Sequence, residues 1–186
     1  MSIPKRLGTA LLAFLVASPT FAQDGLNSHT HGNATLQLAF RNLELVIYLR
    51  GAAVDFLGSE HQPFSAEASA KDQALERAMR DPAYWIVLPA AAGCTLSQVH
   101  LGKHHVISGR GVAPEIMDSN ADSVVAEHLD LNFTYSFLCA NPQRFDSAQV
   151  KLFEHFPSLE SVQVKIAGEQ QSRQQLTPGD TVLRLP

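Results

Sequence analysis

The chain has 186 residues, of which 45% are hydrophobic and 17% are charged, and its formal net charge at pH 7 is −4. This length and composition predict one globular domain with a sizeable core and exclude intrinsically disordered and collagen-like classes. The negative net charge argues against a nucleic-acid partner, because nucleic-acid binding depends on clustered basic residues. The eight histidines are the unusual count in this composition.

Residues 1–22 have the pattern of a secretory signal peptide. Lys5 and Arg6 give a positively charged start, a mostly apolar run follows, and Thr20 and Ala22 place small residues before a cleavage site. The apolar run is shorter than the roughly 20 residues that span a bilayer, so we expect no membrane insertion. We therefore predict a chain that is exported to the periplasm.

After the predicted signal peptide, residues 23–33 are polar and predict a histidine-containing N-terminal arm. Residues 34–186 then predict a single domain in which alternating apolar residues mark the strands. We expect strands at 34–40, 43–49, 85–88, 94–107, 124–140, 161–166 and 181–185. The two residues Arg41 and Asn42 separate the first two strands and predict a hairpin turn.

Two helices are expected between these strands. Ser65 is a suitable N-cap for a helix at about 66–80, and Asp146 or Ser147 can cap a shorter helix that runs to about Phe156. A loop is predicted at 108–122. The order of elements favours an α+β fold with a largely antiparallel sheet over alternating βαβ units.

The two cysteines are predicted to form the disulfide Cys94–Cys139, because export places an even number of cysteines in an oxidising compartment. A thiolate metal site or a nucleophile is the alternative, but the chain has no CxxC motif and both cysteines lie in apolar, strand-like runs. In the chain-entropy treatment, a crosslink over this separation stabilises the fold by roughly 4 kcal/mol.

Seven of the eight histidines are distributed in a way that indicates metal binding. Neutral imidazole is a good ligand for zinc, and nearby carboxylates can supplement it or orient it. The candidate ligands are His29, His31, His61, His100, His104, His105 and His128. His155, in the second predicted helix, is better explained as a structural or exposed residue.

The spacing of these histidines supports a shared site. In an extended segment, His29 and His31 point to the same side. His100, His104 and His105 lie within six residues, and His128 shares one strand face with Asp130. For His29 with His31, and for His61, incidental surface histidines are an equally good explanation when each is considered alone.

Motifs for catalysis are missing from the sequence. The chain has no HExxH, GxSxG, Walker loop or GxGxxG pattern. We therefore expect a protein without enzymatic activity. An exported metallo-hydrolase is a distant alternative that would need a general base such as Glu60.

Several short motifs lie along the predicted mature chain. They are His29 to Leu36, Phe56 to Pro63, Ala92 to Leu96, Glu127 to Asp130 with Tyr135 to Cys139, and Leu152 to Pro157. Together these motifs resemble the ZrgA-like family of periplasmic zinc uptake proteins. The similarity extends over about residues 29–166, and the order and spacing of the motifs make it fairly specific.

The resemblance implies a periplasmic, non-catalytic protein that binds zinc and assists an ABC-type or related zinc uptake system. At the matching positions, His29, His31, His61 and His128 are the implied ligands. Many relatives carry a long tract rich in histidine and aspartate between the two cysteines, whereas residues 97–127 contain only three histidines. This difference favours a single site over storage of many zinc ions. The alternative function is a metal-independent interaction module of the cell envelope.

Overall fold

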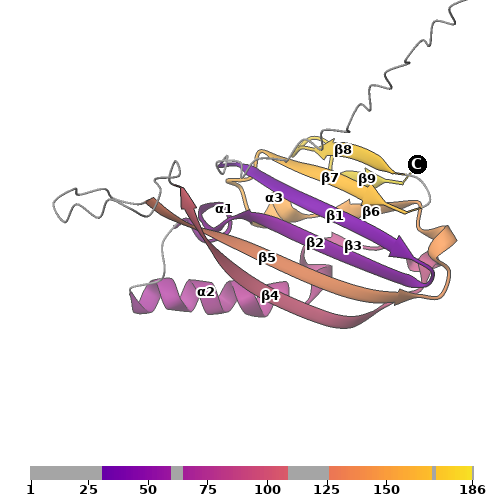
Figure 1. The fold of residues 1–186 in the computed structure, drawn as a ribbon, viewed down its shortest axis with the longest axis horizontal. Coiled ribbons are helices and arrows are strands. Elements are labelled where there is room, and N and C mark those ends of the chain that lie inside the picture. The colour runs from indigo at the N-terminus through magenta and orange to yellow at the C-terminus, as the bar shows by residue number, and fades with distance from the viewer. Residues whose placement is uncertain (1–30, 60–64, 109–125, 169–170, 186) are drawn as a thin grey trace, which may run out of the picture.

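Figure 1 shows the fold of a computed structural model, which describes residues 31–59, 65–108, 126–168 and 171–185. For 104–108 and 126–128 it describes the backbone alone. The predicted signal peptide, most of the predicted arm and nearly all of the predicted 108–122 loop lie outside the described residues.

A six-stranded sheet with the order β4-β5-β2-β1-β7-β8 forms the frame of the molecule. Its strands are β1 (Asn33–Arg41), β2 (Glu44–Ala52), β4 (Cys94–Ser108), β5 (Ala126–Cys139), β7 (Ser161–Ala167) and β8 (Ser172–Leu176). All neighbours are antiparallel except β1 and β7, which run parallel. β4 and β8 are the two edges of this sheet.

The remaining elements pack against one face of the large sheet. They include a second sheet with the order β3-β6-β9 and three helices (Figure 1). Their bounds are β3 (Ile86–Val87), β6 (Ser147–Val150), β9 (Val182–Arg184), α1 (Ala53–Leu57), α2 (Ala66–Met79) and α3 (Leu152–His155). Three 3-10 turns connect them, η1 (Pro82–Tyr84), η2 (Ala90–Ala92) and η3 (Pro142–Arg144).

The alternation of apolar residues explains which face of the sheet carries the core. In β1, Leu36 and Leu38 are buried, whereas Gln37 and Ala39 are exposed. Since successive strand residues point to opposite faces, one face of the sheet is apolar and packs on the second layer. The apolar residues of that face join one continuous core with those of the covering elements.

A hydrogen-bonded aromatic pair lies in this core. The Trp85 Nε1–H donates to the hydroxyl of Tyr135 over 3.1 Å, and this hydroxyl donates to the carbonyl oxygen of Met79 over 2.7 Å. Burial raises the pKa of Tyr135 far above its ordinary value of 10, although the hydrogen bond from Trp85 acts in the opposite direction. The pair therefore joins β5 to the end of α2 with every polar atom of the two side chains bonded.

The predicted fold class is confirmed. The structure is a single α+β domain with a mostly antiparallel sheet and the disulfide Cys94–Cys139, whose two residues are register partners on β4 and β5. The predicted helix at 66–80 is α2, and the Ser65 hydroxyl oxygen caps it by accepting a hydrogen bond from the Ala68 N–H. Within the described residues, no helix is long and apolar enough to cross a membrane.

Local predictions differ from the structure at several places. Residues 147–150 form strand β6, so the second predicted helix is reduced to α3. β8 and α1 were not predicted. The hairpin turn is one residue later than expected, at Asn42 and Leu43, where Asn42 has a φ of 54°. Asparagine tolerates this left-handed conformation, so the turn follows the residue that can adopt it.

Candidate metal site at one end of the sheet

The segment that carries His31 is fixed to two other elements at the start of β1. The N–H of Gly32 donates to Asp55 Oδ1 over 2.9 Å, and its carbonyl oxygen accepts from Glu160 and Ser161 over 2.7 and 3.0 Å. Gly32 has a φ of 78°, which a side chain would strain. The backbone next to the exposed His31 is therefore held between α1 and the start of β7.

Helix α1 carries the chain from the end of β2 to this same region. Its Asp55 side chain is buried and holds Gly32, and Phe56 packs edge-on against Phe133 and Phe156 with ring centroids 5.8 and 4.8 Å apart. Gly58 ends the helix with a φ of 75°. Glu60 and His61 follow shortly after, but they lie outside the described residues, as does His29.

The end of β4 and the start of β5 reach the same end of the sheet (Figure 1). In the register of these strands, His104 is opposite Asp130, and His128 is opposite Val106. Opposite residues in a ladder share a face, and so do residues two apart on one strand. Positions 104, 128 and 130 therefore lie on one face, with 104 and 128 as diagonal neighbours about 7–8 Å apart.

The carboxylate in this group is buried and paired. Asp130 has an exposed side-chain fraction of 1%, and its Oδ2 accepts hydrogen bonds from Arg50 Nε and Nη2, each over 2.7 Å. Arg50 lies on the neighbouring strand β2 and is itself 47% exposed. The guanidinium gives this buried carboxylate hydrogen bonds and an opposite charge together, so the pair fixes Arg50 relative to β5.

The other predicted ligands lie elsewhere. His105 is opposite Leu129, so its position is on the opposite face from 104, the face that α2 covers. His100 is exposed and opposite Thr134, four residues from His104, which corresponds to about 13 Å along a strand. At that separation, His100 and His104 cannot bind one ion together.

The structure therefore brings three of the predicted ligand positions, 31, 104 and 128, to one end of the sheet. Among the side chains that the structure describes, no group of three histidine, cysteine, aspartate or glutamate residues is arranged to hold a metal ion. His155 is exposed on α3, where its ring stacks on Tyr84 with centroids 3.9 Å apart. This agrees with the structural interpretation of His155.

Two residues of this region were missed in the sequence. Asp55 is the one acidic residue in the otherwise apolar run from Val54 to Leu57. An isolated acid in such a run could have indicated that its side chain is buried and hydrogen-bonded, as the structure shows. Nothing in the sequence indicated that Arg50 pairs with Asp130, since an arginine near the end of a strand is common. Its role depends on the pairing of β2 with β5, which no local pattern reveals.

Fold and site together define a small α+β protein in which separate histidine-bearing segments meet at one end of a mostly antiparallel sheet. Residues 28–185 match a family described as ZrgA family zinc uptake protein, and the chain belongs to this family. The resemblance seen in the short motifs is thereby confirmed over nearly the whole predicted mature chain. No curated protein matches the chain.

Proposed function

We propose that the protein is a periplasmic zinc-binding protein that assists zinc uptake without catalysis. Membership in the ZrgA family supports the connection with zinc uptake. The predicted signal peptide supports the periplasm. The proposed ligands come from the histidines at the start of β1, at the end of β4 and at the start of β5, with His61 as a further candidate on sequence grounds.

The observation that carries this proposal is the strand register. It places positions 104 and 128 on one face beside Asp130, and β1 is separated from β5 only by β2. Two strand spacings amount to about 10 Å, a separation that two histidine side chains can close when they meet at one ion. The start of β1, the end of β4 and the start of β5, which are far apart in the sequence, thus lie at one end of the sheet, and this supports a shared zinc site.

The surroundings suit an ion that has to be handed on. Histidine ligands bind only as neutral imidazoles, so the affinity for zinc would fall as the pH is lowered. The buried carboxylates Asp55 and Asp130 hold the backbone at Gly32 and the side chain of Arg50. They act as positioning residues around the ligands, as outer partners do in metal sites generally.

The test is zinc stoichiometry and affinity, measured by competition with a chromogenic chelator. The sample is the exported protein, stripped of metal and with its disulfide intact. The variants are His31→Ala, His104→Ala and His128→Ala, with His155→Ala as the matched control, since His155 is exposed on α3. We expect one zinc ion at sub-micromolar affinity, and each of the three site variants should weaken it by at least about tenfold.

Three outcomes would contradict the proposal in different ways. Absence of zinc binding would leave the metal-independent interaction module as the better explanation. Equal loss in His155→Ala would show that the effect is not specific to this end of the sheet. Weak binding of several ions that is abolished by His100→Ala would move the site to the exposed face of β4, about 13 Å away.

A further inference from the structure

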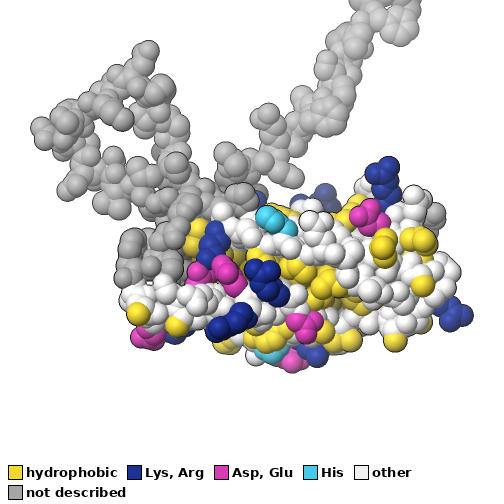
Figure 2. All heavy atoms as spheres, turned by 90° about the horizontal axis from the view of Figure 1, so that it is seen from below, with side chains coloured by type: hydrophobic (Ala, Val, Ile, Leu, Met, Phe, Trp, Pro, Cys, Tyr) yellow, Lys and Arg dark blue, Asp and Glu magenta, His cyan; other side chains and the backbone are white. Residues whose placement is uncertain are grey.

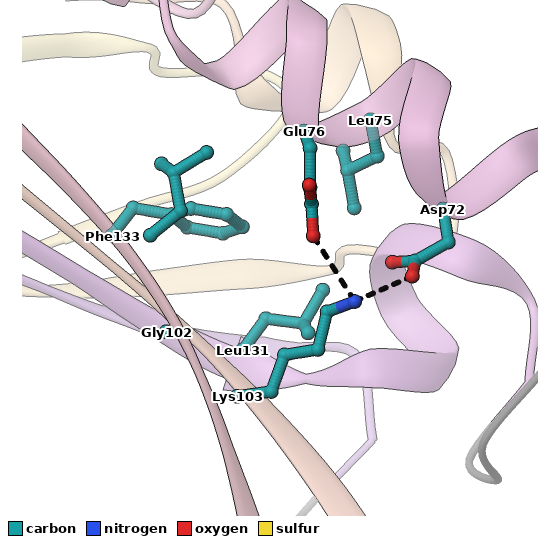
Figure 3. Close-up of a pocket in the computed structure, with 8 residues that line it drawn as sticks. Asp72, Leu75, Glu76, Gly102, Lys103, Leu131 and Phe133 are labelled. Carbon is teal, nitrogen blue, oxygen red and sulfur yellow. Dashed lines mark hydrogen bonds and ion pairs between the residues drawn. The ribbon is translucent and has the colours of Figure 1, made fainter.

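A cavity of about 280 Å³ lies between α2 and the large sheet, on the face opposite His104 and Asp130 (Figure 3). Its walls are mainly apolar side chains of α2, β4 and β5. They belong to Leu75, Leu101, Leu131 and Phe133. Binding pockets for drug-sized molecules have volumes of about 300–1,000 Å³, so this slightly smaller cavity suits a ligand of only a few heavy atoms.

Charged side chains close one side of the cavity. Lys103 on β4 extends toward α2, where its Nζ lies 2.5 Å from Asp72 Oδ2 and 3.2 Å from Glu76 Oε1 (Figure 3). Partial burial alone would lower the pKa of Lys103, but the hydrogen bonds and negative charges of both acids outweigh it and raise this pKa above 10.5. Lys103 therefore remains a cation at neutral pH.

One buried acceptor at this cavity is not satisfied. Asp72 is only 9% exposed, and its Oδ1 has no hydrogen-bond partner in the part of the chain that the structure describes. A buried carboxylate oxygen without a donor costs free energy, and in native proteins such an atom calls for an explanation. Asp72 lines the cavity, and its Oδ1 has almost no accessible surface. A ligand in the cavity therefore supplies the missing donor when the Asp72 carboxylate turns toward it.

The charge balance restricts the chemistry of that ligand. Two carboxylates and one ammonium leave a net charge of −1 at the cavity. One monocation neutralises it, whereas a carboxylate or phosphate would add to the negative charge. Figure 2 views the molecule from below in Figure 1, the side where α2 lies, and shows acidic and basic side chains there next to apolar surface. The ligand should thus combine a cationic head with a short apolar body.

We propose that this cavity binds a small primary amine with an apolar body, its ammonium group donating to Asp72 Oδ1 and its body lying against Leu131 and Phe133. The cavity and the candidate zinc site lie on opposite faces of the sheet. The proposed amine binding is therefore independent of the proposed zinc binding, and an experiment that disproves one of them does not disprove the other.

Isothermal titration calorimetry with 3-methylbutylamine and 2-phenylethylamine tests the proposal on the full exported protein. The alcohol 3-methylbutan-1-ol, which has the same apolar body, and 3-methylbutanoate, which has the opposite charge, are the ligand controls. We expect millimolar or tighter binding of at least one of the two amines. The alcohol should bind at least about tenfold more weakly, because its hydroxyl can donate to a carboxylate but lacks the positive charge. The acid should not bind, because it adds a negative charge.

Variants of α2 locate the binding. Asp72→Asn should weaken the binding of the amine at least about tenfold, and Glu76→Gln, at a more exposed position, should weaken it less. The matched control is Glu67→Gln, since Glu67 is exposed on the same helix and pairs with Lys71. If Asp72→Asn is too unstable for the titration, the weakening of amine binding in Glu76→Gln is the result that tests the proposal.

Several results would overturn the proposal. They are no binding of either amine, equal binding of amine and alcohol, or binding that is unchanged in both Asp72→Asn and Glu76→Gln. Zinc that displaces the amine and binds more tightly at the same residues would also overturn it, because the cavity would then be a metal site.

Discussion

Single buried polar residues hold the candidate metal end of the sheet together. Asp55 accepts from the backbone of Gly32, and Asp130 accepts from two nitrogen atoms of Arg50. Burying a charge is unfavourable unless the charge is paired and hydrogen-bonded, so each carboxylate restricts the position of its partner. The segments that lead to the candidate ligands are therefore connected by specific polar contacts as well as by apolar packing.

Tyr135 shows how one hydroxyl can contribute to stability in the core. Tyr135→Phe removes the acceptor of the Trp85 Nε1–H and the donor to Met79 while it keeps the ring. Both groups left behind are buried, so we expect the free energy of unfolding at pH 7 to fall by about 1–3 kcal/mol. Urea unfolding followed by Trp85 fluorescence measures this change.

The same variant has a pH dependence with a defined sign. Burial raises the pKa of Tyr135 above 10, so above pH 10 the unfolded chain releases this proton while the folded protein keeps it. The unfolded state then binds fewer protons, and the stability of the wild type falls as the pH rises past 10. Tyr135→Phe lacks this loss, so the difference in stability between the two proteins should shrink above pH 10.

Tyr48→Phe is the matched control for this experiment, because Tyr48 is half-buried on the outer face of β2. Its difference from the wild type gives the effect of removing a tyrosine hydroxyl outside the network of Trp85 and Met79. A constant difference for Tyr135→Phe would show that Tyr135 does not keep its proton in the folded state above pH 10.

At the scale of the element, sequence patterns predicted the structures that bury one face. In β5, every second residue from Leu129 to Cys139 is apolar and buried. On the other face of this strand Asp130 and Asn132 are also buried, which the alternation did not predict. β8 was not predicted because Ser172–Leu176 is an edge strand with four polar residues, which do not form the apolar alternation of a buried strand. β6 resembled a helix because Asp146 and Ser147 are good N-caps, while its pairing with β3 and β9 comes from distant segments.

The disulfide secures an edge strand at one of its ends. Cys94 starts β4 and lies opposite Cys139 at the end of β5, and 45 residues separate them in the sequence. Replacing both by alanine should lower the free energy of unfolding by roughly 4 kcal/mol, because the unfolded chain gains conformational entropy. Urea unfolding of Cys94→Ala/Cys139→Ala measures this loss.

The reduced wild type is the control for that variant. Reduction of the disulfide should reproduce most of the loss, since it removes the same crosslink without changing side-chain volume by much. A loss below about 1 kcal/mol in both samples would mean that the ladder between β4 and β5 restricts the chain without the crosslink. A large loss in the alanine variant alone would indicate a packing defect.

At the scale of the whole molecule, the candidate site depends on topology that local patterns do not encode. The histidine motifs are recognisable one by one, but His31, His104 and His128 are up to 97 positions apart in the sequence. They share one end of the sheet because β2 pairs with both β1 and β5, and β4 returns along β5. Such pairings of distant strands follow from the packing of the whole domain and cannot be predicted from a short stretch of sequence.

If zinc joins these segments, it should change the dynamics of one end of the molecule. Amide hydrogen exchange, followed with and without saturating zinc, should slow at residues 31–33, 53–59 and 129–132. Local openings there separate the proposed ligands, so bound zinc opposes them. The hairpin end around 39–46 opens without disturbing the site, and its local exchange should not change. His31→Ala should lose the protection at all three segments, and zinc-dependent slowing at the hairpin end alone would contradict a site at the start of β1.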